Sequence, residues 1–330
     1  MAPMSNVDLA GAVARLRKAG RVLIVSHLHP DGDAIGSTLG LAALARALGV
    51  REAQCLNNDP VPFPYQWLPG ARDIKIPDNA WDAPCDLAVV VDTSAWDRLG
   101  GAADAVRKAR EVLVLDHHLV DAPLGDHYLV DPSYAASGEL VMELHDAAGV
   151  DIERAAAQAL YVAIATDTGG FRFSNTTPRT HRLAARLLET GLDVAAISER
   201  VFDGMTPAKF ELMRRALGRA EFHAGGAVAH ASISRADMRA AQAGPNETEG
   251  IINYLRNVDS VQVAIVFREL DETTTKVSMR SRNGFNSAEF LQQFGGGGHA
   301  LAAGATLALP LEEARGVLLD RVASIVGEST

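Results

Sequence analysis

The sequence predicts an α/β protein in which an N-terminal doubly wound, mainly parallel sheet is joined by a helical linker to a smaller α+β domain. Short apolar runs such as RVLIVS at residues 21–26 alternate with helical patterns in the first half, which is typical of buried parallel strands. After about residue 220 the pattern changes to short β-like runs. Because 330 residues suffice for two cores, we expect three parts: 1–190, 191–220 and 221–330.

The first half opens with helical spacing over residues 1–20, which Gly20 ends. The strands expected after it are 21–26, 87–91 and 112–115. The helices expected between and after these strands are 34–48, 138–148 and 152–166. In a doubly wound sheet the ligand crevice lies outside the carboxyl ends of the strands. Polar residues directly after these strands are therefore the first candidates for a functional site.

The second half begins with a helical, charged stretch over residues 178–217, which Pro178 and Pro207 interrupt and which we interpret as the connector. Strands are expected at 227–233, 261–268 and 274–280. Helices are expected at 249–256, 287–294 and 311–325. This mixture predicts an α+β domain.

Composition limits the classes of function. A net charge of −10 argues against a long basic stripe for duplex DNA, because duplex affinity comes from many Lys and Arg contacts to phosphate. Cys55 and Cys85 lie outside any CxxC pattern, which argues against a zinc finger or a redox motif. Without a leader peptide or a long apolar run, the expected location is cytoplasmic, with no membrane partner.

Asp and His stand where apolar runs end, at four separate places. These residues are His27, Asp31, Asp33, Asp92, Asp116, His117, His118 and Asp167. Mixed imidazole and carboxylate ligands are typical of a two-metal hydrolytic site, so the pattern points to phosphoester chemistry.

Each cluster also has an ordinary structural interpretation. Asp31 and Asp33 in HPDGDA suit a surface turn that caps a helix. A DHH triplet on the surface would be unremarkable. After the apolar run EVLVL, however, adjacent ionisable residues are costly to bury unless they are paired or bound to metal. Four matching clusters together favour the metal site.

The segments HLHPDGDAIGS, VVVDTS, VLDHH and ATDTGGFRFSNTT resemble the four motifs of the DHH phosphoesterase superfamily. The tail FGGGGHALAAGA, preceded by VSMRSR, resembles the DHH-associated substrate-binding domain. Length and layout are most similar to the nanoRNase subgroup, which degrades short RNA and dephosphorylates 3′-phosphoadenosine 5′-phosphate. The resemblance makes 1–190 the catalytic, metal-binding domain and 221–330 the substrate-binding domain.

The resemblance implies two ligand sets that share Asp92: His27, Asp31 and Asp92 for one ion, and Asp33, Asp92, His117 and Asp167 for the other. His118 would then face the scissile phosphate, and Asp116 would orient the neighbouring imidazoles. His29 has no ligand role in this assignment. Asp92, Asp116 and His118 are the expected catalytic residues.

The run from Gly295 to Gly298 predicts a nest of backbone amides that approaches phosphate closely. A flexible linker is the alternative, but the apolar flanks Phe294 and Leu301 favour the nest. The resemblance implies that Arg280 and Ser281 contact phosphate, and with the nest the predicted substrate contacts are Arg280, Ser281, Gly296, Gly297, Gly298 and His299. Arg282, on the same strand face as Arg280, suits a solvated charge.

Several further residues have weaker signals. Arg98 and Arg172 follow motif ligands and could contact phosphate, although a surface arginine is the simpler interpretation. Phe171 and Phe173 could stack on a base, but core packing in an FxF strand is favoured.

We therefore expect a two-metal phosphoesterase that hydrolyses short oligoribonucleotides, dinucleotides and 3′-phosphoadenosine 5′-phosphate by attack of a metal-activated hydroxide on phosphorus. Manganese is the first choice of metal, and the ligand types leave magnesium, cobalt and zinc open. The expected partners are short single-stranded RNA or DNA and small nucleotides, and a homodimer stays open. Alternatives are a cyclic-dinucleotide phosphodiesterase, a RecJ-type exonuclease, a family II pyrophosphatase and a non-enzymatic nucleotide sensor.

Overall fold

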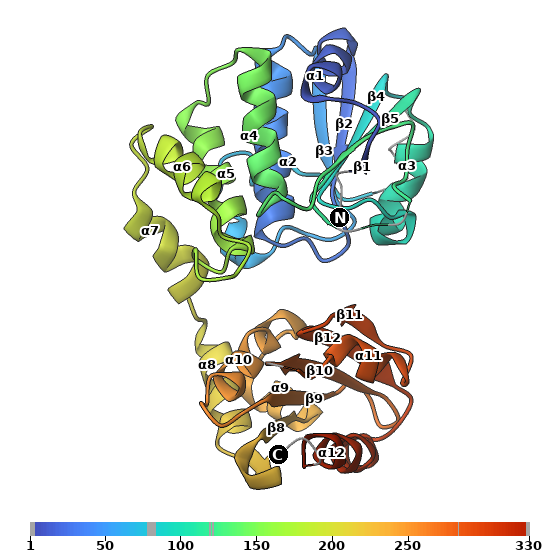
Figure 1. The fold of residues 1–330 in the computed structure, drawn as a ribbon, viewed down its shortest axis with the longest axis vertical. Coiled ribbons are helices and arrows are strands. Elements are labelled where there is room, and N and C mark those ends of the chain that lie inside the picture. The colour runs from blue at the N-terminus through green and yellow to red at the C-terminus, as the bar shows by residue number, and fades with distance from the viewer. Residues whose placement is uncertain (1–3, 78–83, 119, 121, 283, 328–330) are drawn as a thin grey trace. The chain divides into compact units, whose positions relative to one another are not determined.

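The computed structural model describes residues 4–77, 84–118, 120, 122–282 and 284–327. The chain divides into two compact units, Met1–Gly204 and Met205–Thr330 (Figure 1). The division falls inside the segment 191–220 that the sequence predicts as a linker. Each unit has its own sheet and its own hydrophobic cores.

A six-stranded sheet with the order β1-β6-β5-β4-β2-β3 forms the centre of the first unit. Its strands are β1 (Met4–Ser5), β2 (Arg21–Val25), β3 (Glu52–Leu56), β4 (Leu87–Val91), β5 (Glu111–Asp116) and β6 (His127–Val130). All neighbours pair in parallel except β1 and β6. From β2 the chain builds outward to β3 and then returns to build β4, β5 and β6 on the other side. The crevice of a doubly wound sheet is therefore expected between β2 and β4.

Helices cover both faces of this sheet (Figure 1). They are α1 (Leu9–Lys18), α2 (Gly32–Ala47), α3 (Ala103–Arg107), α4 (Ser137–Ala148), α5 (Arg154–Asp167), α6 (Pro178–Leu188) and α7 (Val194–Ser198). Alternate residues of the strands point to opposite faces: Val89 of β4 joins the core under α1, α2, α4 and α5, whereas Val90 joins the core under α3. The predicted doubly wound fold is confirmed.

Helix α2 packs directly on α5 because glycines replace side chains at the crossing. A Cβ atom at Gly36 would collide with the carbonyl oxygen of Ala159, and one at Gly40 would lie 2.5 Å from Leu160. The same close approach brings Gly32, at the start of α2, against Thr166 at the end of α5. The acidic start of α2 is thereby held beside Asp167.

The second unit is an α+β domain around a mixed sheet with the order β11-β12-β10-β9-β8-β7. Its strands are β7 (Glu221–His223), β8 (Val228–Ile233), β9 (Val263–Glu269), β10 (Thr275–Ser281), β11 (Gly297–His299) and β12 (Ala302–Leu307). Its helices are α8 (Pro207–Leu217), α9 (Arg235–Ala241), α10 (Ile251–Arg256), α11 (Ser287–Gln292) and α12 (Leu311–Gly327). Helices α11 and α12 cover one face, and α8, α9 and α10 cover the other.

Two local predictions are wrong. The segment 1–20 is not helical throughout, because Met4–Ser5 pairs with β6 before α1 begins. The expected FxF strand is a turn in which Phe171 has a φ of 64°; Phe171 still packs against the core, whereas Phe173 is 47% exposed. In the glycine run, Gly297 and Gly298 pair with Gly304 and Ala303 of β12, and its contact with phosphate stays a prediction. Short β pairing and turn chemistry depend on distant partners, which periodicity does not report.

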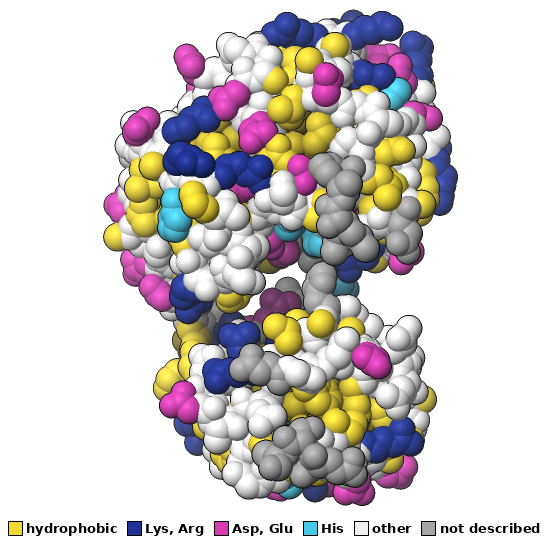
Figure 2. Space-filling model, viewed as in Figure 1, with side chains coloured by type: hydrophobic (Ala, Val, Ile, Leu, Met, Phe, Trp, Pro, Cys, Tyr) yellow, Lys and Arg dark blue, Asp and Glu magenta, His cyan; other side chains and the backbone are white. Residues whose placement is uncertain are grey.

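None of the helices in the described part of the chain combines the length and the apolar character that crossing a bilayer requires. Figure 2 shows Lys and Arg in small groups on the drawn face, with Asp and Glu between them. This distribution agrees with the net charge of −10 and gives no sign of a continuous basic stripe on that face.

Candidate metal centre

The eight Asp and His residues of the predicted site lie at or next to the ends of helices and strands in the first unit. His27 follows β2, Asp92 follows β4, and Asp116 ends β5. Asp31 caps the start of α2, where its Oδ1 accepts the backbone N–H of Ala34 at 3.0 Å, so the capping interpretation is also correct. The donor atoms gather into three groups: His27, Asp31 and Asp92; Asp33, His117 and Asp167; and Asp92, His117 and His118.

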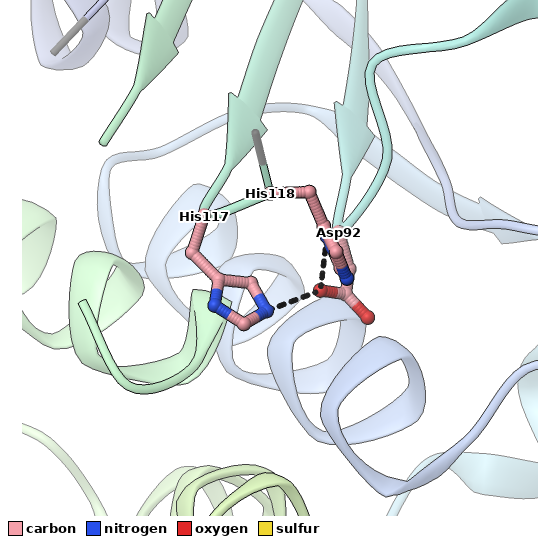
Figure 3. A group of neighbouring side chains, drawn as sticks. All are labelled: Asp92, His117 and His118. Carbon is pink, nitrogen blue, oxygen red and sulfur yellow. Dashed lines mark ion pairs between the residues drawn. The ribbon is translucent and has the colours of Figure 1, made fainter. Parts of the chain in front are cut away.

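His117 has its Nε2 atom in the middle of three carboxylates. This atom lies 3.5 Å from Asp92 and from Asp167 and 3.7 Å from Asp33. It is buried and forms no hydrogen bond with any of the residues that the structure describes. The other ring nitrogen lies 3.3 Å from the carbonyl oxygen of Tyr134, which suits an Nδ1–H donor and directs Nε2 at the carboxylates. Figure 3 shows the rings of His117 and His118 beside Asp92.

His27 faces the opposite side of the same cluster. Its Nε2 lies 3.3 Å from Asp92 and 3.9 Å from Asp31. Its Nδ1 lies 2.8 Å from the carbonyl oxygen of Leu28, so a proton on Nδ1 again leaves Nε2 for a ligand. Both buried imidazoles thus have the orientation that metal ligands need.

Asp92 is the residue that the two sides share. It is 2% exposed, and its φ of 66° lies in the left-handed region, which Asp and Asn tolerate better than most residues. Its Oδ2 faces His27, whereas its Oδ1 faces His117 and accepts the hydroxyl of Ser137 at 2.9 Å.

The beginning of helix α4 holds the carboxylates of Asp33 and Asp92, a role that sequence reasoning missed. The backbone N–H groups of Ser137 and Gly138 donate to Asp33 at 2.6 and 2.9 Å. A helix N-terminus favours negative charge, so it stabilises this buried carboxylate. The available signal was the SGEL segment, in which small polar residues open an apolar helical run.

Asp116 orients the DHH turn rather than facing the cluster. Its Oδ1 accepts the backbone N–H groups of His117 and His118 and lies 2.8 Å from Nδ1 of His118. Its Oδ2 accepts the hydroxyl of Ser94 at 2.5 Å. The imidazole of His118, which is 40% exposed, is therefore fixed at one edge and accessible to solvent.

Proton affinities in the cluster reflect this crowding of buried charge. Burial raises the pKa of Asp167 to about 6, with repulsion from Asp92 and Asp31 added. Burial and neighbouring carboxylates also raise the pKa of Asp33 well above its usual range. Burial acts to lower the pKa of His117, but the contact with Asp92 and the other carboxylates outweighs it and raises this pKa to about 10.

These residues fit divalent cations. Carboxylates this close together need either shared protons or a cation between them. An ion that displaces the protons would take Nε2 of His117 as a ligand and offset the negative charge of the carboxylates around it. Mixed imidazole and carboxylate donors suit manganese, cobalt and zinc, and the carboxylates suit magnesium.

The substrate contacts predicted in the second unit occupy different environments. Arg280 on β10 is half-buried, and burial, assisted by nearby Arg256, lowers its pKa. Among the described residues no Asp or Glu forms an ion pair with it, so its charge remains available to an anion. Ser281 is buried and donates to the carbonyl oxygen of Phe285 at 2.7 Å, which favours holding the strand end over contacting phosphate directly. Gly296 is half-buried and donates its N–H to Leu291. The side chain of His299 lies outside the described residues.

Three residues with weaker or no predicted roles lie at the surface of the first unit. The guanidinium of Arg98 lies 3.2 Å from Nδ1 of His27, so Arg98 borders the cluster; it would donate to this nitrogen only in the tautomer that has its proton on Nε2. Arg172 is exposed and bonds to the carbonyl oxygen of Gly169. His29 is exposed, and its backbone N–H donates to Asp59, which agrees with its having no ligand role.

The chain is similar to known proteins over most of its length. Residues 21–164 match the model of the DHH family, N-terminal domain, and residues 225–328 match the DHHA1 domain. A bifunctional oligoribonuclease and PAP phosphatase NrnA of Thermus thermophilus is 36% identical, covering 94% of this chain and 92% of the relative. The protein of the same name from Mycoplasma pneumoniae is 29% identical, covering 91% of each chain. The crystal structure of an exopolyphosphatase-related protein from Bacteroides fragilis superposes with a TM-score of 0.89 at 25% identity, covering 96% of this chain and 97% of that one.

Proposed function

This chain belongs to the DHH family of phosphoesterases, and we propose that it hydrolyses short oligoribonucleotides and 3′-phosphoadenosine 5′-phosphate with two divalent ions. The observation that carries the proposal is the buried Asp92 carboxylate, which faces His27 through one oxygen and His117 through the other. The names of the relatives from Thermus and Mycoplasma support the two substrate classes.

The proposed ligand sets follow this geometry. Asp92 belongs to both sets, because its two oxygens face opposite sides of the cluster. The first set is His27, Asp31 and Asp92, and the second set is Asp33, Asp92, His117 and Asp167. Ser137 and the backbone of α4 hold Asp92 and Asp33 in place. When bound, the ions supply Lewis acidity and lower the pKa of a water enough for it to attack phosphorus.

His118 is proposed to contact the phosphoryl oxygens. The carboxylate of Asp116 lies 2.8 Å from its Nδ1, so that nitrogen carries the proton that fixes the ring. Burial acts to lower the pKa of His118, but the hydrogen bond to Asp116 and the negative charges of Asp92 and Asp116 together outweigh it and raise this pKa. A raised pKa favours the protonated ring, which can donate a hydrogen bond to an oxygen whose negative charge increases as the phosphoester bond breaks.

Arg280 is proposed to bind the phosphate that is not cleaved. Its guanidinium is half-buried without an acidic partner among the described residues, and arginine matches the geometry of phosphate with two parallel hydrogen bonds. Manganese is the proposed metal, because the donors combine imidazole with several carboxylates.

Replacing His118 by Ala is expected to lower kcat while the content of bound metal stays at the wild-type level. The loss would be on the order of 10²–10³, as for other groups that stabilise transition-state charge. Metal analysis of the purified variant, together with steady-state kinetics, checks this expectation. Loss of one ion from the His118→Ala protein would mean that His118 is a ligand, as its distance of 3.9 Å from Asp92 also allows.

Short substrates are expected to react fastest. Because the net charge is −10 and Lys and Arg are interspersed with acids on the face in Figure 2, a long strand gains little attraction beyond the site. RNAs graded from about two to about twenty nucleotides test this, with rates falling steeply above about five. Equal rates across the series would favour a RecJ-type exonuclease instead. Pyrophosphate and cyclic dinucleotides in the same assay test the other enzymatic alternatives, and binding without turnover of every substrate would favour the sensor.

A further inference from the structure

Two histidines and a glutamate meet on one face of the edge strands of the second unit. Glu221 and His223 are two residues apart on β7, so their side chains point to the same face. His230 on β8 is paired directly opposite Glu221 and shares that face. The register therefore places the three side chains together, with His223 and His230 on a diagonal.

The donor atoms of this cluster lie at distances that suit one small cation. Nε2 of His223 is 3.1 Å from Nδ1 of His230 and 4.0 Å from a carboxylate oxygen of Glu221. All three donor atoms lie within 4.8 Å of one another. In a tetrahedral zinc site with bonds of 2.0–2.2 Å, ligand atoms are about 3.3–3.6 Å apart. The two nitrogens nearly have this spacing already, and the exposed Glu221 has room to approach.

The surroundings also suit a cation. His230 is 1% exposed, and burial lowers its pKa to about 4, so its imidazole is neutral at neutral pH. An open hollow of about 450 Å³ beside it has room for water. Ser232, two residues further along β8, lines this hollow with a buried hydroxyl oxygen that has no hydrogen-bond partner in the described part of the chain.

Each of the two nearby arginines has an acidic partner, which offsets part of its charge, although Arg315 still acts to lower the pKa of His230 and so disfavours positive charge there. Arg219 is 2.6 Å from Asp237, and Arg315 is 2.6 Å from Glu312. A direct hydrogen bond between the two stacked imidazoles is the simpler arrangement, with ring centroids 5.1 Å apart. That bond alone would use neither Glu221 nor the Ser232 hydroxyl.

We propose that Glu221, His223 and His230 form a third divalent-cation site, of the zinc class, that fastens the edge strand β7 to β8. Imidazole donors favour zinc over magnesium or calcium, which prefer oxygen ligands. The site lies within the second unit and does not depend on the proposed hydrolytic function.

The test uses the full chain carrying Asp33→Asn and Asp92→Asn, which weaken the centre in the first unit. Calorimetric titration with Zn²⁺ is expected to show one remaining equivalent, which His223→Ala removes. His223 is partly exposed, so this variant is expected to fold. The matched control is Glu272→Gln, which changes an exposed carboxylate of the same unit.

Histidine-detected NMR of the same background identifies where the ion binds. The ring signals of His223 and His230 are expected to shift with one equivalent of Zn²⁺. The proposal is overturned if these two signals stay unchanged while those of His27 or His117 shift, or if His223→Ala keeps the full Zn²⁺ uptake.

Discussion

Replacing Asp92 by Asn is expected to abolish hydrolysis of every substrate while the chain stays folded. The variant keeps the shape of the side chain but removes the charge that faces both His27 and His117. Loss of a group that only supports a metal ligand lowers metal affinity or activity roughly 10–100-fold. Loss of a ligand that both ions share is expected to lower activity by more than this factor, because neither ion then keeps its position.

Asn is the informative replacement because Asp92 has a φ of 66°. Asn tolerates this conformation, whereas Ala would add backbone strain and confuse loss of fold with loss of metal. The measurements are kcat/KM in manganese, bound metal, and the thermal midpoint. The control is Asp104→Asn, an exposed carboxylate on α3. A folded Asp92→Asn protein with activity within about tenfold of wild type would refute the shared-ligand assignment.

Replacing Gly297 by Val is expected to raise KM without loss of stability. Gly297 is exposed on the edge strand β11, and a Cβ atom there would meet no atom of the described residues within 4 Å. Val suits a strand, so the fold gains no strain. If phosphate approaches this backbone, the added side chain blocks hydrogen bonds to a charged group, each of which contributes about 1.5–3 kcal/mol. The expected rise in KM is therefore about ten- to a hundredfold.

Gly298 provides the structural comparison. Its φ is +139°, and a Cβ atom there would lie 2.6 Å from the carbonyl oxygen of Ala302. Gly298→Val is therefore expected to lower the thermal midpoint through strain in β11, whereas Gly297→Val is not. An unchanged KM for Gly297→Val, measured with 3′-phosphoadenosine 5′-phosphate, would remove the glycine segment from the substrate site.

Much of the first unit could be predicted from the sequence because its signals are local. The strand Leu87–Val91 has the predicted bounds, since an apolar run flanked by polar residues defines a buried parallel strand. The doubly wound topology of the first unit could then be predicted from the alternation of strands and helices. Asp92 and Asp116 stand at neighbouring strand ends for that reason alone, and a doubly wound sheet brings such ends to one edge.

The relative placement of the helices was not available from the sequence. Asp167 reaches the cluster because Gly32 and Gly36 let α2 lie directly on α5, a contact between segments more than a hundred residues apart. Ser137 and Gly138 hold Asp33 because α4 begins beside α2. Neither contact leaves a periodic signal.

The sequence by itself determined which side chains could bind metal, because strand ends and side-chain chemistry can be recognised from neighbouring residues alone. Only the tertiary structure decided that the Nε2 of His117 is buried among three carboxylates and that the carboxylate of Asp92 faces two histidines. It also decided that the glycine run is partly an edge strand and that Glu221, His223 and His230 meet. The physical reason is that hydrogen bonding and cross-strand register depend on partners distant in the chain, whereas periodicity reports only neighbours.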